Sequence, residues 1–181
     1  QKAAKAQEAG AFKSEIIPIG GLDYDDGIRK ETSLEQMAGL KPAFQKDGSV
    51  TAATSSPHTD GAAAVLVTSE EYALKHNLPI LAKIKAFAGS GCEPDIMGIG
   101  PVEAIKKVLK RAELSMSDMD VFELNEAFAA QCLAVLQELD KQGIPLPIEK
   151  LNMDGGAIAL GHPLGASGAR ITGKAASILQ R

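Results

Sequence analysis

The chain alternates between short apolar runs and longer segments with helical periodicity, and this alternation limits its fold more than any other feature. The apolar runs of strand length are 61–67, 82–88 and 121–124. The segments with helical periodicity are 69–75, 100–112, 127–139 and 165–179. Residues 61–67 are small and apolar without interruption, which indicates a strand buried on both faces. Strands and helices in alternation predict an α/β layered domain.

The composition limits how such a domain could pack and what it could bind. The sequence has no Trp and only 4% aromatic residues, so the core would consist mainly of small aliphatic side chains and glycine. The net charge of −4 argues against a nucleic-acid surface, and no apolar run is long enough to cross a membrane. Two cysteines do not form a disulfide framework, which favours a reducing compartment such as the bacterial cytoplasm or an organelle matrix.

Both ends of the sequence have the pattern of a helix that lacks its boundary residues. Residues 1–10 are strong helix formers with Gly10 at a C-cap position, but neither a capping residue nor an initiator Met precedes them. Residues 175–181 stop within another helical pattern. We therefore expect a piece of a longer protein, in which a further strand follows Arg181.

Short motifs at fixed positions carry most of the chemical information. In chain order they are Thr51–Ser56 with Asp60–Ala64, Asp95–Pro101, Asn125–Ala129 and Gly155–Arg170. In this order and spacing they resemble the thiolase family, whose enzymes make or break a carbon–carbon bond between acyl groups carried on coenzyme A. The resemblance covers nearly the whole chain, and the long block around Gly161-His162-Pro163 is its most specific part.

The resemblance implies a fold of two similar α/β halves, packed as a five-layered αβαβα sandwich with a loop domain inserted in the first half. On this basis residues 1–48 would be the end of the loop domain and the connection from the N-terminal half. Residues 49–181 would be most of the C-terminal half, without its last strands. The missing N-terminal half would be a partner of this region, and the whole protein would be a homodimer or homotetramer.

The family's reaction is thiolytic cleavage of a 3-ketoacyl-CoA, or the Claisen condensation of acetyl-CoA, through a cysteine acyl-enzyme. The resemblance implies that the nucleophilic cysteine lies upstream of this chain. It places the acid/base cysteine in a Cys-x-Gly motif beyond Arg181. The coenzyme A thioester is the substrate, and no permanently bound cofactor or metal is expected. We therefore expect this polypeptide alone to be inactive.

The catalytic residues that the resemblance assigns within this chain are His162 and Asn125. His162 would donate a hydrogen bond to the thioester oxygen as that oxygen gains negative charge, and Asn125 would hold a water in the same oxyanion site. The residues around His162 agree, because Gly161 and Pro163 allow a tight turn before a helix, where the helix dipole disfavours a second proton on the ring. The alternatives are a buried structural histidine and, for Asn125, a helix N-cap.

The resemblance also implies residues that contact coenzyme A or the acyl group. They are Ser56, Ala52, Met97, Ala127 and Phe128. For Met97 the alternative is ordinary filling of the core, which is the usual role of methionine. Asp154 and Pro57 depart from the common family pattern, and Asp154 could change the charge beside His162.

Neither cysteine of this chain matches a catalytic cysteine of the family. Cys132 would be an inert thiol on a helix, and Cys92 lies in the loop 89–94. Two other functions stay open at this point. One is a coenzyme A-binding relative that has lost catalysis, and the other is an assembly subunit that uses the same fold.

Overall fold

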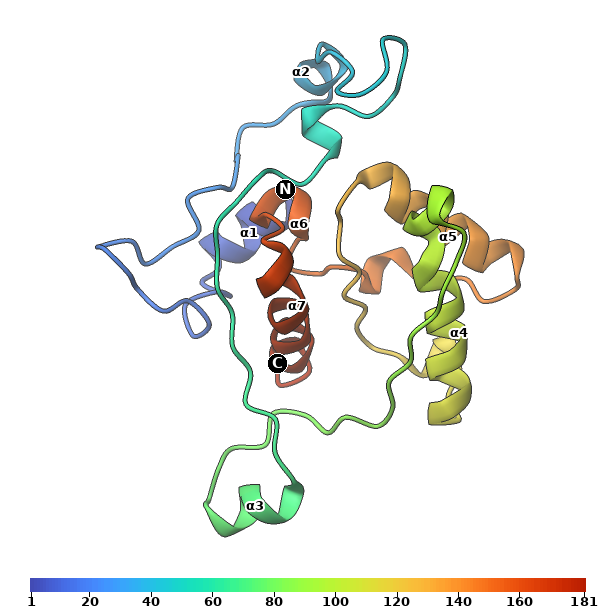
Figure 1. Cartoon of the computed structure of the whole chain (residues 1–181). Coiled ribbons are helices and arrows are strands. Elements are labelled where there is room, and N and C mark those ends of the chain that lie inside the picture. Colours follow the sequence, from blue (N-terminus) through green and yellow to red (C-terminus); the bar gives the residue numbers. More distant parts are fainter.

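The computed structural model describes residues 1–181 as a set of helices joined by long connecting stretches (Figure 1). The α-helices are α1 (Lys2–Glu8), α2 (Leu34–Ala38), α3 (Glu70–Lys75), α4 (Gly100–Ala112), α5 (Ala129–Lys141), α6 (Ala157–Leu160) and α7 (Leu164–Ile178). Short 3-10 helices are η1 (Ala52–Thr54), η2 (Pro94–Ile99), η3 (Met116–Asp118) and η4 (Ile148–Lys150). None of the α-helices has both the length and the apolar character that a membrane span requires.

The predicted helices are confirmed, most of them within a few residues. The segment 100–112 is α4 with the same bounds, because Pro101 suits a first turn and the apolar positions recur with helical spacing. Ser69 caps α3, since its Oγ accepts a hydrogen bond of 3.1 Å from the backbone N–H of Tyr72. The helix predicted at 127–139 starts later, at Ala129, because Phe128 is extended.

The predicted strands at 61–67 and 82–88 are wrong for this chain, as neither pairs with another segment. Backbone pairing outside the helices is limited to isolated bridges, and none of them involves these residues. The prediction that 61–67 is buried on both faces also fails, since Leu66 is 77% and Val67 is 68% exposed. A strand requires a neighbour that takes up its backbone hydrogen bonds, and no part of these 181 residues lies alongside to do so.

The predicted strand 121–124 is partly formed. Phe122 and Leu151 make a parallel bridge. The N–H of Phe122 donates to the carbonyl of Lys150 at 2.9 Å, and the N–H of Asn152 donates to the carbonyl of Phe122 at 2.8 Å. These hydrogen bonds therefore fix the backbone from which residues 123–125 continue.

Two packed regions position the rest of the chain. In the first, α4 and α5 enclose a core of Val102, Met116, Val135 and Leu139, with Phe122 and Leu124 packed against it. In the second, α1 lies against the segment that leads into α6, and small residues allow the close approach. A side chain at Gly155, for example, would lie 2.6 Å from the Cβ of Ala3.

Candidate functional site

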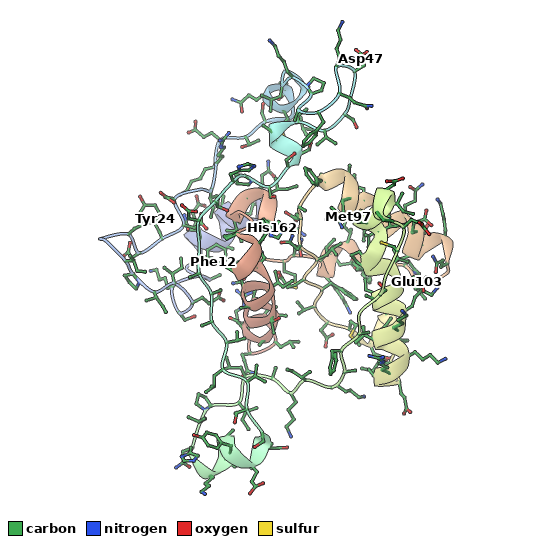
Figure 2. The ribbon with its side chains drawn as sticks, viewed as in Figure 1. Phe12, Tyr24, Asp47, Met97, Glu103 and His162 are labelled. Carbon is green, nitrogen blue, oxygen red and sulfur yellow. The ribbon has the colours of Figure 1, made fainter.

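His162 lies on the tight turn between α6 and α7, near the centre of the view in Figure 2. Gly161 ends α6 with φ 89°, which an L side chain rarely adopts, and a Cβ there would overlap the side chain of Thr59. The Oγ1 of Thr59 accepts a hydrogen bond of 3.0 Å from the backbone N–H of His162. The turn and Thr59 together therefore fix the backbone from which the imidazole projects.

One nitrogen of the imidazole has a partner within the chain. Nδ1 of His162 lies 2.6 Å from Oγ of the buried Ser167, and that Oγ is also 3.2 Å from the carbonyl of Pro163. The single hydroxyl proton of Ser167 can go either to the Pro163 carbonyl or to Nδ1. We assign it to the shorter contact, with Nδ1, so that the ring carries its own proton on Nε2 and can donate there. The Ser167 contact thus orients the ring and leaves Nε2 without a hydrogen bond inside the chain. The sequence motifs did not single out Ser167 as a functional residue.

Asn125 comes three residues after the bridge between Phe122 and Leu151, and its Oδ1 is buried without a hydrogen-bond partner. A buried amide oxygen of this kind normally has a partner such as ordered water. The N-cap interpretation of Asn125 is wrong, because α5 begins at Ala129 and its N-cap position is Phe128. The Oδ1 of Asn125 therefore takes no part in capping α5, and its hydrogen-bonding capacity is not used within the chain.

The loop before residue 60 contacts both elements that carry the predicted catalytic residues. The N–H of Ser56 donates to the carbonyl of Ala127 at 2.9 Å, and Ser55 forms an antiparallel bridge with Phe128. Thr59 in the same loop holds the N–H of His162. One short segment thus connects the Asn125–Ala129 motif with the His162 turn.

Four of the five residues predicted to contact coenzyme A lie near this loop. They are Ala52 in η1, Ser56, Ala127 and Phe128. The ring of Phe128 also packs edge-on against Phe44, with centroids 5.9 Å apart.

Met97 is the fifth, and it lies on η2, on the side of α4 and α5 (Figure 2). η2 packs on α5, where the amide of Gln131 donates to the carbonyl of Gly98 at 3.2 Å. Met97 is 77% exposed, so the interpretation of this residue as core filling is wrong. Its side chain is available for contact with another molecule or chain segment.

Asp154 precedes the Gly155-Gly156 pair, and its charge is matched by two cations. Its Oδ2 accepts from Lys174 Nζ at 3.1 Å and from Arg181 at 2.7 Å. The acidic group is therefore neutralised locally. This explains how a carboxylate is accommodated here without placing an unpaired charge beside His162.

Glu123, two residues before Asn125, is a largely buried carboxyl group. Burial raises the pKa of Glu123 to about 7, and the nearby Arg170 and Lys174 oppose this rise only in part. Oε1 of Glu123 and two guanidinium nitrogens of Arg170 are buried without partners. Glu123 and Asn125 alternate with the core residue Leu124, so both project away from the α4–α5 core.

The two cysteines have different environments. Cys92 is exposed, whereas Cys132 is buried on α5, and its Sγ is 3.6 Å from the carbonyl of Asn125. Burial, assisted by the charge of Glu126, raises the pKa of the Cys132 thiol to about 11. The thiol is thus protonated at neutral pH, and a protonated thiol is a poor nucleophile.

We expect a Cys132→Ser variant of the full-length protein to retain turnover within about threefold of the wild type, since the thiol is neutral and a serine hydroxyl can also donate to the Asn125 carbonyl. Alkylation with iodoacetamide near neutral pH, followed by peptide mass spectrometry, should modify Cys92 and spare Cys132. The exposed thiol of Cys92 serves as the internal control. A loss of turnover of about a hundredfold for Cys132→Ser, with the fold intact, would make this thiol catalytic.

No second candidate site is found in a surface hollow or in a cluster of metal-binding side chains. A hollow lined by Cys92, Ile99 and Glu138, among others, lies in the α4–α5 region and contains none of the predicted site residues. No group of three or more His, Cys, Asp or Glu side chains is arranged to hold a metal ion.

Comparison with protein families and curated proteins identifies relatives for the whole chain. The family profile described as "Thiolase, C-terminal domain" matches residues 78–181, and "Thiolase, N-terminal domain" matches residues 1–71. A protein of Staphylococcus epidermidis named "Probable acetyl-CoA acyltransferase" is 52% identical, over 94% of this chain and 44% of the relative. The "3-ketoacyl-CoA thiolase" of Aliivibrio fischeri is 54% identical, over 94% of this chain and 46% of the relative.

Solved structures show the same path of the backbone. Human mitochondrial 3-ketoacyl-CoA thiolase in complex with CoA superposes with a TM-score of 0.90 and 48% identity, over 100% of this chain and 45% of that one. The acetyl-CoA acetyltransferase of Bacillus anthracis gives a TM-score of 0.92 and 45% identity, over 99% and 46%. The predicted fold class is thereby confirmed, although no sheet forms within these residues. The chain spans less than half the length of the relatives it matches.

Proposed function

The chain belongs to the thiolase family, and on this premise we propose that the whole protein transfers acyl groups between coenzyme A thioesters through a cysteine acyl-enzyme. The reaction is either the cleavage of a 3-ketoacyl-CoA by coenzyme A or the reverse condensation of acetyl-CoA. The observation that carries the proposal is the arrangement at His162, a ring oriented through Nδ1 by Ser167, with Nε2 left without a partner in the chain.

In the cleavage direction, a cysteine thiolate adds to the 3-keto carbonyl, and the bond between C2 and C3 breaks. The acyl group stays on the cysteine, and the electron pair moves to C2, whose charge is shared with the thioester oxygen. We assign His162 Nε2–H and a water held by Asn125 to stabilise that oxygen. A second cysteine protonates C2 to give acetyl-CoA, and a coenzyme A thiol then takes the acyl group from the first.

Both thiols would come from parts of the protein outside these 181 residues. Cys132 is unsuited because its pKa is raised to about 11, and Cys92 has no base among its contacts, only the carbonyl of Met97 at 3.8 Å. We propose that residues 1–48 belong to the loop domain and the connection from the N-terminal half, and residues 49–181 to the C-terminal half, whereas the two family profiles divide the chain between residues 71 and 78.

We assign the path of coenzyme A to the loop that contains Ala52 and Ser56, together with Ala127, Phe128 and Met97. The contacts between Ser56 and Ala127 support a common surface for the first four. The human relative with CoA bound supports coenzyme A as the ligand class. We further propose a homodimer or homotetramer without a permanently bound cofactor, acting in the cytoplasm or in an organelle matrix.

A thiolysis assay with acetoacetyl-CoA and coenzyme A tests this assignment. We expect the full-length protein to release acetyl-CoA and the purified 181-residue chain to release none, because this chain has no suitable nucleophile. Thiolysis by the isolated chain would show that the thiols have been assigned to the wrong region. A full-length protein that binds coenzyme A but cleaves nothing would instead be a relative that has lost catalysis.

A further inference from the structure

The carboxylate of Glu126, the residue after Asn125, connects the two motifs of the proposed site. Its Oε1 accepts a hydrogen bond of 2.8 Å from the side-chain amide of Asn152. Its Oε2 accepts one of 3.2 Å from the backbone N–H of Ile158 in α6. Each oxygen of Glu126 thus accepts from a protein donor, which fixes the carboxylate against the chain's own backbone and side chains and favours a positioning role over that of a general base.

Only a glycine fits at position 156, because the carboxylate of Glu126 occupies the space where a side chain would lie. A Cβ on Gly156 would overlap the carboxyl carbon and both oxygens of Glu126. The buried glycine therefore allows the carboxylate to lie directly against the backbone that leads into α6. α6 is a single turn that ends at Gly161, and His162 follows immediately. A shift of Glu126 would be transmitted over this one turn to the imidazole.

Asn152 fixes the other side of the same motif. It is 3% exposed and adopts a left-handed conformation with φ 43°. Its Oδ1 accepts from the N–H of Leu124 and its Nδ2 donates to the carbonyl of Leu124, each at 2.9 Å. The side-chain amide of Asn152 thus makes the two hydrogen bonds to Leu124 that a neighbouring strand would otherwise make, one step beyond the Phe122–Leu151 bridge. It thereby holds the backbone directly before Asn125.

We propose that Glu126 and Asn152 form a clamp that sets the spacing between Asn125 and His162, and that Glu126 is a positioning residue for the reaction. The inference rests on the proposed function, since it assumes that these two residues act on one oxygen. An oxyanion site depends on donors held in place before charge develops, and misplacement by about 1 Å can cost about a hundredfold in rate. The clamp supplies that rigidity through hydrogen bonds on both sides of Asn125.

The test is a double-mutant cycle in the full-length protein with acetoacetyl-CoA as the probe. Glu126→Ala, Asn125→Ala and His162→Ala are each compared with the double variants, by kcat, KM and unfolding temperature. We expect Glu126→Ala to lower kcat by about fiftyfold, with KM within about threefold. In the Asn125→Ala or His162→Ala background, the further loss should be below about threefold, because the spacing no longer matters.

A merely structural Glu126 would lower kcat by the same factor in every background, and that result overturns the clamp. If Asn125→Ala and His162→Ala keep full activity, the proposed function itself fails, which is a distinguishable result. Glu126→Gln covers the case in which the alanine variant does not fold, since it keeps the shape and one of the two acceptors. It should show a smaller loss, about tenfold, with the same non-additivity. The exposed Glu149, replaced by Gln, is the matched control and should change nothing.

Discussion

A His162→Ala variant of the full-length protein is expected to turn over about a thousandfold more slowly than the wild type, with coenzyme A binding changed by less than about threefold. The side chain makes one hydrogen bond within the chain, from Nδ1 to Ser167. Its removal therefore costs the fold little but removes a donor aimed at charge that develops only during the reaction. Such a donor contributes to kcat far more than to ground-state binding.

The control for this variant is His76→Ala. His76 ends α3 and stacks on Tyr72 with ring centroids 4.2 Å apart, far along the chain from the site. Steady-state thiolysis gives kcat and KM, and calorimetric titration with coenzyme A gives the affinity. A His162→Ala enzyme that loses affinity but keeps its turnover would mean that His162 binds coenzyme A and does not stabilise the transition state.

The sequence predicts the helices well because their causes are local. Pro101 at a first turn and the cap at Ser69 act within one or two turns of the chain, and the structure has α3 and α4 where these signals lie. The strands 61–67 and 82–88 fail for the opposite reason. An apolar run shows that a segment can pair, but pairing also requires a neighbour, which these residues do not supply.

In the candidate site, too, the local features could be predicted and the non-local ones could not. Gly161 and Pro163 predict a tight turn at His162, and the structure has Gly161 at φ 89°. Ser167 could have been found, since a serine five residues after a histidine that precedes a helix lies in the first turn of that helix. The amide of Asn152 could not, because its partner Leu124 is 28 residues away and the pairing depends on how two elements pack.

The least predictable feature is a buried ion cluster that joins the first and last segments of the chain. Lys174 of α7 is 3% exposed, and its Nζ donates to Glu15 Oε1 at 2.7 Å and to Asp154 Oδ2 at 3.1 Å. The ammonium also lies 4.5 Å from the centre of the Phe12 ring. Since Glu15 is 159 residues from Lys174 in sequence, only the fold brings the two together.

A Lys174→Met variant of the full-length protein is expected to lose about 3–5 kcal/mol of stability, because it removes the cation that the two carboxylates share. Asp154 keeps Arg181 at 2.7 Å, but Glu15 then has no cation within the cluster. Urea unfolding measures the loss as a lower midpoint at unchanged slope.

Lys83→Met is the matched control for this experiment. Lys83 pairs with Glu70 at 2.6 Å, as short a contact as that of Lys174, but the two side chains are 68% and 55% exposed. Its loss should be below about 1 kcal/mol and should shrink further in high salt, whereas the loss at Lys174 should persist, because salt screens buried charges weakly. Equal losses for the two variants would contradict a buried cluster. A selective loss at Lys174 would show that the ion pairs of α7 with Asp154 and Glu15 stabilise the protein. Because Asp154 lies directly before the backbone that leads to His162, the position of that backbone would then depend on contacts with both ends of the chain.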